Sequence, residues 1–408
     1  MCLNAETFRR LDYTMETIII GYNHYNTLGL IWSLGKGGHK ITLMLYSDKN
    51  NYVAKSRYIS QVYLISKCDD VIQSLTKIAI NMTEKPVVFV SNDVDANLLN
   101  EHSLELSKVC YFEGGRDGNI INFYRNKDNQ LILASKCGFK IPTTVVVQSP
   151  ADFTKYIFDF PIFIKANNSI NGGKAAMKVC TSICDASDFV SQLPNKYYPI
   201  QVQEYITKDY ELMIQGCSLY CGSRVICPVA NKKQRQYPKL TGAGAWSESV
   251  FVIGNPQLES LVEKIAIYMK YIGYTGNFSA EFLCSRDEFY FLEINLRNDG
   301  TSWLSTCSGY NLPDLVAKSF VDPLVSIDND SFVRRNFMNI PCEIGEYIIG
   351  TINLRQFLSE IKPQTCYSHY NPSDKKTWWA YFNPFRRIPR IIVMRFLHKF
   401  KKLTLWRY

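Results

Sequence analysis

The sequence lacks most features that would assign it to a membrane, secreted or zinc-binding class. No run of about 18 uncharged apolar residues occurs, so a transmembrane helix is not expected. Residues 1–17 also lack the apolar core of a signal peptide. The five histidines and the absence of a CxxC pair disfavour a zinc site. The 13 cysteines are odd in number and scattered, which predicts reduced thiols in a cytoplasmic protein.

Acidic residues are missing from the C-terminal segment. Residues 386–408 contain eight Lys and Arg and no Asp or Glu, so most of the net charge of +9 resides there. A duplex-binding protein usually carries its basic surface on the folded domain. We therefore expect no nucleic-acid partner.

The N-terminal part has the pattern of an α/β fold. The chain has 408 residues, 46% of them apolar, which suits a globular protein of two or three domains. Apolar strand patterns alternate with helical patterns, and this predicts a doubly wound parallel sheet. The strands are expected at 17–20, 41–46, 58–65 and 86–93, and the helices at 28–38 and 69–81. The first turn, GYNHYNTLG, lacks G-x-G-x-x-G, so no dinucleotide is predicted there.

The pattern changes near residue 120. An amphipathic helix is expected at 127–140 and another helix at 257–272, with mostly antiparallel strands between and after them. The polar, glycine-bearing stretch at 229–249, VANKKQRQYPKLTGAGAWSES, is interpreted as a loop. The strands are expected at 143–147, 160–166, 177–181, 201–206, 211–222, 224–230, 279–285 and 288–296.

The hairpin at 279–296 carries charged side chains where a sheet would normally stay apolar. Because side chains alternate along a strand, one face is expected to hold Phe291, Glu293, Asn295 and Arg297, and the other Tyr290, Leu292, Ile294 and Leu296. Pairing the two strands sets Glu281 opposite Glu293 or within a residue of it. Two carboxylates and an amide oxygen suit Mg²⁺. A solvated sheet face salt-bridged to Arg297 is the alternative.

A polar loop follows Lys165, at the end of an apolar strand. Its sequence, NNSINGGKAA, includes Ser169, Gly172, Gly173 and Lys174. Two ammonium groups and uncovered backbone NH donors suit a polyphosphate. A simple hairpin turn is the alternative, because the pattern is not that of a P-loop.

In this order the motifs resemble, over roughly residues 1–320, an ATP-grasp enzyme such as biotin carboxylase or D-alanine ligase. The resemblance implies an α/β (α+β ATP-grasp) fold in three parts. A Rossmann-like preATP-grasp domain would occupy 1–120. A two-lobed ATP-grasp domain would occupy 121–322, with a small lobe at about 121–200 and a large lobe at about 201–322. The rest, 323–408, would be an extension with a basic amphipathic helix.

The resemblance also implies site residues. The phosphates of ATP would be held by Lys127, Lys165 and the loop from Ser169 to Lys174. The linker QEYI would contact adenine through Glu204, Tyr205 and Ile206, and Glu211 would bind the ribose hydroxyls. The metal ligands would be Glu281, Glu293 and Asn295, followed by Arg297 as a phosphate-facing cation.

The activity implied is an ATP-dependent carboxylate–amine ligase that uses Mg²⁺ or Mn²⁺ and an acyl-phosphate intermediate. Lys233 and Arg235, grouped with Lys232, would neutralise the acyl-phosphate or clamp a substrate carboxylate; a solvated loop is the alternative. RQYP at 235–238 is similar to the D-aspartate ligase-like branch, which suggests cell-envelope or glycan biosynthesis. Two other functions stay open. One is a carbamoyl-phosphate synthase-like enzyme, although that enzyme needs two ATP-grasp units, and the other is a non-catalytic ATP-binding protein.

The basic tail has its own interpretation. Large apolar side chains interleave with cations after Pro389, as in interfacial helices. This pattern favours peripheral contact with the cytoplasmic face of a membrane. A helix docked on its own domain and a contact within a homodimer are the alternatives.

Overall fold

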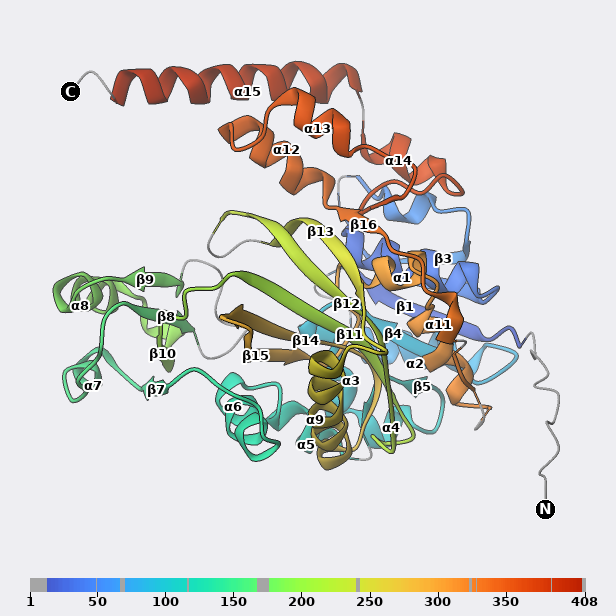
Figure 1. Ribbon diagram of the computed structural model, residues 1–408. Helices are drawn as coiled ribbons and strands as arrows, with labels where there is room; N and C mark the ends of the chain where they lie inside the picture. Colours follow the sequence, from blue (N-terminus) through green and yellow to red (C-terminus); the bar gives the residue numbers. More distant parts are fainter. Residues whose placement is uncertain are drawn as a thin grey trace.

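The computed structural model describes residues 13–48, 50–66, 70–115, 117–166, 176–239, 243–322, 325–327, 329–382 and 384–405 (Figure 1). Within these ranges, no helix is both long enough and apolar enough to cross a bilayer.

The N-terminal region is a parallel five-stranded sheet in the order β3-β2-β1-β4-β5, which confirms the doubly wound prediction. Its central strand contains three consecutive isoleucines, 18–20, with no exposed surface, because apolar cores cover both faces of the sheet. The strands are β1 (Glu16–Gly21), β2 (Lys40–Tyr46), β3 (Ile59–Ile65), β4 (Val87–Val90) and β5 (Tyr111–Phe112). The helices are α1 (Tyr25–Lys36), α2 (Val71–Ile80), α3 (Asp93–Glu101), α4 (Ser103–Leu106) and α5 (Gly118–Phe123).

The small lobe projects from one side of the molecule, at the left of Figure 1. Its antiparallel sheet has the order β7-β10-β8-β9 and encloses a core of its own. The antiparallel pairing of β8 with β9 confirms the expected pairing of these two strands. Its elements are β7 (Thr144–Val147), α7 (Pro150–Phe153), β8 (Ile162–Ala166), β9 (Lys178–Cys180), α8 (Ile183–Gln192) and β10 (Ile200–Glu204), preceded by α6 (Lys127–Lys136).

The large sheet has the order β15-β14-β11-β12-β13-β16-β17, with β6 (Gly114–Gly115) paired to β14, and its last two strands come from residues beyond 322. The long helix α9 of the large lobe begins with an Asn255 cap that accepts from the Leu258 NH and ends at Gly273 in the left-handed conformation, φ 67°. The strands are β11 (Tyr210–Leu219), β12 (Arg224–Tyr237), β13 (Ala243–Phe251), β14 (Tyr274–Ser285), β15 (Glu288–Asn295), β16 (Asn336–Met338) and β17 (Thr365–Tyr367). The helices are α9 (Pro256–Ile272), α10 (Ser302–Cys307) and α11 (Leu312–Ser319).

The expectation of a loop at 229–249 is wrong. Most of that stretch belongs to the paired strands β12 and β13. The polar pattern arises because these strands carry their cations toward partners: the Lys232 ammonium lies 4.1 Å from the ring centre of Tyr210, and Lys233 is paired with two glutamates. Composition alone therefore led to the prediction of a loop where the structure has two strands of the main sheet.

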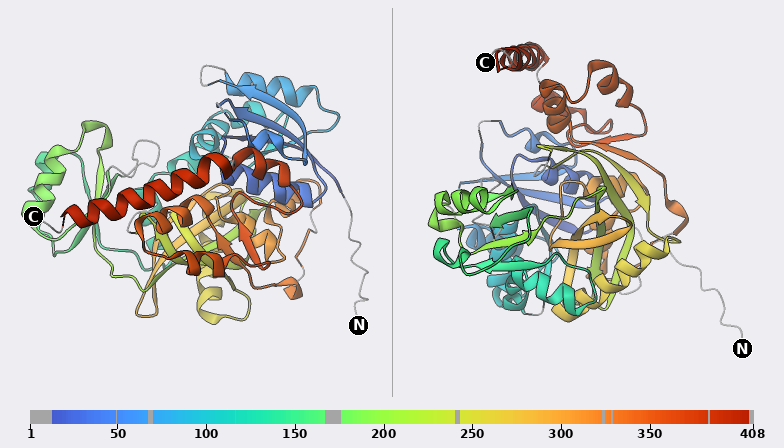
Figure 2. Two further views of the ribbon diagram at one scale, coloured as in Figure 1. Left: turned by 90° about the horizontal axis from the view of Figure 1, so that it is seen from above. Right: turned by 60° about the vertical axis from the view of Figure 1, so that its left-hand side comes forward.

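The helices of the C-terminal extension lie across the top of the large sheet in Figure 1. They are α12 (Ile340–Ile349), α13 (Leu354–Glu360), α14 (Lys375–Tyr381) and α15 (Pro384–Leu405). Helix α15 begins at Pro384 and includes Pro389, so it starts earlier than the sequence suggested. It runs along the outside of the molecule and reaches past the other helices of the extension (Figure 2).

Candidate functional site

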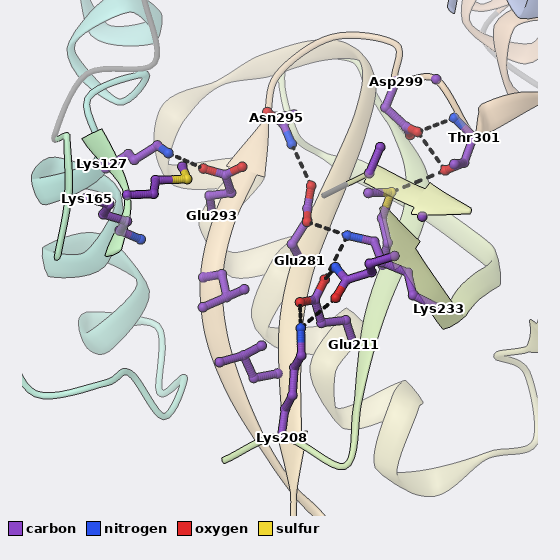
Figure 3. Close-up of a pocket in the computed structure, with 18 of the residues that line it drawn as sticks. Lys127, Lys165, Lys208, Glu211, Lys233, Glu281, Glu293, Asn295, Asp299 and Thr301 are labelled. Atoms are coloured by element: carbon purple, nitrogen blue, oxygen red, sulfur yellow. Dashed lines mark hydrogen bonds and ion pairs between the residues drawn. The ribbon is translucent and has the colours of Figure 1, made fainter. Parts of the chain in front are cut away.

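A cavity of about 510 Å³ lies where the N-terminal region, the small lobe and the large sheet meet. Its polar lining residues come from all three regions, so the complete site forms only in the folded chain. Figure 3 shows the central group, which extends from Lys127 and Lys165 on one side to Asp299 and Thr301 on the other. The charged side chains that line the cavity are Asp93, Lys127, Lys165, Glu204, Lys208, Glu211, Lys233, Glu281, Glu293, Arg297 and Asp299.

The hairpin β14–β15 sets Glu281 directly opposite Glu293, as predicted. The expected alternation nevertheless fails at Phe291. The next pair after Glu281 and Glu293 is Phe282 with Phe291, so a bulge accommodates Leu292 as an extra residue. Phe291 is fully buried in the core, whereas Leu292 lines the cavity beside Glu293. The bulge thus turns one more apolar side chain toward the site.

Lys127 and Glu293 form an ion pair at one end of the cavity. The Lys127 Nζ lies 2.9 Å from Glu293 Oε2. Lys127 is the first residue of α6, whose start is capped by the Asn126 side chain. Burial alone would raise the pKa of Glu293, but Lys127 and Lys165 hold it at about 2. Conversely, Glu293 outweighs burial and raises the pKa of Lys127.

Lys165 lies beside this pair on β8, only 5% exposed. Within the described part of the chain its ammonium makes no hydrogen bond or ion pair. Burial, followed by the repulsion of Lys127, lowers its pKa to about 7. The site therefore contains a buried amine that an anionic ligand would favour in its charged form.

A second cluster is centred on Lys233. Its Nζ donates to Glu281 Oε2 and to Glu211 Oε2, both at 3.0 Å. Glu211 is also bound by Lys208 and, at 2.6 Å, by Gln236. Lys208 and Gln236 were not predicted from the sequence as site residues, although Lys208 precedes Glu211 by only three positions. The two glutamates outweigh burial and raise the pKa of Lys233, which is thus a permanent cation.

Arg297 connects the hairpin to the N-terminal region. Its Nε and Nη2 donate to the two carboxylate oxygens of Asp93, at 2.8 and 3.0 Å. Nη2 also lies 3.5 Å from the Asn295 Oδ1, and the Asn295 Nδ2 donates to Glu281 Oε1 at 3.3 Å. Asp93 was missed from the sequence, because nothing local distinguishes it from other acids at a helix start.

The far end of the cavity is polar and contains groups that the sequence argument did not identify. The Asp299 Oδ1 accepts from the Thr301 NH and hydroxyl at 2.6 and 2.7 Å, and the Gln215 Nε2 donates to Asp299 Oδ2 at 3.3 Å. His24 lines the same cavity. Burial, then the charge of Arg297, lowers the pKa of His24 to about 4, so it is a neutral group at neutral pH.

The linker residues Glu204, Tyr205 and Ile206 line the cavity together, next to β8 and β10. The carboxylate of Glu204 accepts from the Thr143 NH at 2.9 Å, which fixes the linker to the small lobe. Ser169, Gly172, Gly173 and Lys174 lie outside the described residues.

The structure does not bring Arg235 into the cavity. Its guanidinium points to the C-terminal extension and forms paired bonds with Glu343 on α12, at 3.1 and 2.9 Å, and with Glu360 on α13, at 3.0 and 2.6 Å. The pairing of β12 with β13 is irregular between Lys233 and Arg235. As a result, the two side chains point in different directions. Arg235 therefore connects the large sheet to the extension.

The donor set around Glu293 fits a divalent cation with oxygen ligands. Among the described residues, no three His, Cys, Asp or Glu side chains gather as a metal-binding group. Two opposed carboxylates and the Asn295 carboxamide do lie on one face of the hairpin. Mg²⁺ commonly takes only one or two protein carboxylates and completes its shell with water and phosphate oxygens. Glu281, Glu293 and Asn295 could hold it in that way.

Comparison with known proteins gives a likeness only at the level of structure. No protein-family model matches the sequence, and no curated protein matches it. Among solved structures, biotin carboxylase from Campylobacter jejuni in complex with β,γ-ATP is similar at a TM-score of 0.61 and 16% identity, over 79% of this chain and 75% of that one.

Two further solved structures are similar to this chain over most of its length. The ADP complex of PurK, N5-carboxyaminoimidazole ribonucleotide synthetase, has a TM-score of 0.64 and 15% identity over 85% of each chain. The L-amino acid ligase from Bacillus licheniformis has a TM-score of 0.58 and 13% identity, over 76% of this chain and 75% of that one. All three are ATP-grasp enzymes. The mixed architecture, with its parallel N-terminal sheet and antiparallel lobes, is therefore the ATP-grasp fold, as the sequence predicted.

Proposed function

We propose that the protein is an ATP- and Mg²⁺-dependent carboxylate–amine ligase. The observation that carries the proposal is the hairpin face on which Glu281 opposes Glu293 while lysines from two other elements neutralise them. Like charges opposed in a buried site repel unless cations lie between them. Here Lys127 neutralises Glu293 and Lys233 neutralises Glu281. A bound metal ion and the phosphates of ATP would interact with the same charged groups.

In this proposal the chain mainly positions substrates and neutralises charge, as phosphoryl transfer requires. Lys127 and Lys165 would bind the phosphates, Glu204 to Ile206 the adenine, and Glu211 the ribose. When held by Glu281, Glu293 and Asn295, Mg²⁺ or Mn²⁺ would neutralise phosphate oxygens. The solved relatives include a biotin carboxylase domain with MgADP, which supports this choice.

The reaction would proceed in two displacements. A carboxylate oxygen attacks the γ-phosphorus of ATP, and ADP leaves. The amine then attacks the acyl carbon, phosphate leaves, and the nitrogen loses a proton. Lys233 and Arg297, both at the cavity, would neutralise the acyl-phosphate, whereas Arg235 is assigned to the interface with the extension.

The acid and amine are proposed to be small molecules of cell-envelope or glycan biosynthesis, by the similarity of RQYP to the D-aspartate ligase-like branch. The protein would act in the cytoplasm, as a homodimer and in peripheral contact with a membrane through α15. No nucleic-acid partner is proposed.

A phosphate-release screen of carboxylates and amines in pairs tests the proposal. We expect ADP and phosphate to appear only when both partners are present, because an acyl-phosphate would be sheltered from water until the amine attacks. Release with bicarbonate and an ammonia donor would instead favour the carbamoyl-phosphate synthase-like alternative. Nucleotide-dependent thermal stabilisation without turnover on any pair would favour a non-catalytic ATP-binding protein.

Lys165 gives an independent prediction about nucleotide binding. With its pKa lowered to about 7, most of its amine is neutral at about pH 8 in the free protein. A bound polyphosphate should restore the charge, so binding takes up close to one proton at that pH. Calorimetry in buffers of different ionisation enthalpy measures this uptake.

Replacing Lys165 with methionine should abolish the uptake, whereas Lys208→Met, which removes another lysine of the cavity, should preserve it. The sign for stability follows from the same shift. Between about pH 7 and pH 10.4 the unfolded chain binds more protons at this lysine, so its contribution to stability rises with pH over that window. An equal uptake in wild type and Lys165→Met would contradict the assignment.

A further inference from the structure

The C-terminal extension contains an apolar groove of about 860 Å³. It lies between α12, α13 and α14 on one side and the first half of α15 on the other. Every lining side chain except that of Lys375 is aromatic, aliphatic or, at Met338, a thioether. This volume is within the range of about 300–1,000 Å³ that small-molecule sites occupy.

The apolar surface continues from the groove along α15. Ile388 and Ile392 line the groove and are 47% and 60% exposed. Phe385 and Phe396, at 90% and 67% exposed, extend the same stripe in steps of three, four and four residues. A contiguous apolar surface of this kind normally marks a binding surface.

The segment that forms the α14 and α15 side of this surface is rich in cations, and no acid of the described ranges lines the groove. Residues 375–408 contain ten Lys and Arg and no Asp or Glu. The guanidinium of Arg387 lies 4.1 Å from the ring centre of Tyr381, and that of Arg395 lies 3.9 Å from the ring centre of Tyr347, which lines the groove. The Nη1 of Arg395 is buried and has no hydrogen-bond partner among the described residues. A buried guanidinium NH with no acceptor calls for an anionic oxygen.

An amphiphile matches this chemistry better than a peptide does. A peptide strand or loop in the groove would bring backbone NH and CO groups that need hydrogen bonds, and the lining offers only tyrosine hydroxyls, tryptophan NH groups and the Lys375 ammonium. An acyl chain makes no such demand. Its anionic head group would meet the arginines at the edge of the groove.

We propose that the extension binds an anionic lipid of a bilayer, with an acyl chain in the groove and the head group at Arg387 and Arg395. This lipid site rests on the membrane contact proposed above, for which it names the binding residues. It does not depend on the ligase chemistry. Helix α15 would lie in the interface with Phe385 and Phe396 directed toward the acyl region.

Vesicle co-sedimentation of the full chain tests this proposal, with phosphatidylcholine alone and with added phosphatidylglycerol. We expect binding only to the anionic vesicles. Phe385→Ser with Phe396→Ser should weaken it at least about tenfold. Arg387→Gln and Arg395→Gln should each weaken it about fivefold at low salt. Leu358→Ser is the matched control, because Leu358 is 56% exposed on α13 and does not line the groove.

Phosphatidylglycerol with a diazirine in its acyl chain tests the groove itself. Crosslinks are expected on groove residues and should be lost in Leu354→Trp, which puts a larger side chain at a half-exposed lining position. Three results would overturn the proposal: equal binding to neutral vesicles, labelling confined to residues outside the groove, or lipid-free self-association that the phenylalanine variant abolishes. Thermal stabilisation by MgATP, measured on the same variants, should be unchanged, so failure here is distinct from failure of the ligase proposal.

Discussion

Replacing Glu293 with glutamine is expected to reduce ATP-dependent phosphate release by more than about 100-fold. The substitution keeps the shape of the side chain and removes the charge that both Lys127 and the divalent cation would need. Loss of an outer-shell partner alone typically costs about 10- to 100-fold in metal affinity, so loss of a direct ligand should cost at least as much. Turnover measured across a Mg²⁺ titration should reveal a weaker apparent affinity for the metal.

The matched control for this substitution is Glu288→Gln. Glu288 lies on the same strand, has a 57% exposed side chain, and pairs with Lys140 at the surface. It should leave turnover unchanged. Asn295→Ala removes the third proposed ligand of the same metal site and should also lower turnover. Full activity of both Glu293→Gln and Asn295→Ala would show that the hairpin face does not hold the metal.

Replacing Arg235 with alanine is expected to lower the free energy of unfolding by about 3 kcal/mol. Glu343 is completely buried and forms an ion pair with Arg235, which also pairs with Glu360. Removing one member of a buried ion pair leaves an uncompensated charge, which is the costly case. Urea denaturation followed by tryptophan fluorescence measures the change.

Arg334→Ala provides the comparison for Arg235. Its side chain is 71% exposed and pairs with Glu248 at the surface, so its loss should cost less than about 1 kcal/mol. Nucleotide affinity should stay at the wild-type value in Arg235→Ala under conditions where the protein is folded. If turnover falls while stability does not, Arg235 acts on the substrate, as the sequence argument assumed.

Strand periodicity predicted one part of the hairpin correctly and another part wrongly. Strand periodicity placed Glu293 and Asn295 on a common face and set Glu281 opposite Glu293, because pairing across a short turn leaves little choice of register. The same periodicity misplaced Phe291 and Leu292. A bulge inserts one residue without any local signal, since the burial of Phe291 against Phe282 decides it.

Arg235 illustrates the opposite case. Lys232, Lys233 and Arg235 are close in sequence, and proximity suggested one cationic group. Ion pairs with acids elsewhere in the chain orient these side chains. Lys233 pairs with Glu211 and Glu281, whereas Arg235 pairs with Glu343 and Glu360. Long-range pairing of this kind leaves no trace in local composition.

The order of strands and helices, the parallel N-terminal sheet, and the common face of Glu281, Glu293 and Asn295 could be predicted from local periodicity and short turns, which act within a few residues. Lys127, Lys165 and Glu211 were expected at the site only from the resemblance to ATP-grasp enzymes. Contacts between distant parts of the chain placed Asp93, Lys208, Gln236 and Asp299 at the cavity and directed Arg235 away from it. They also formed the apolar groove between α15 and the other helices of the extension. The physical reason is that buried charges must find partners wherever the packed fold brings them.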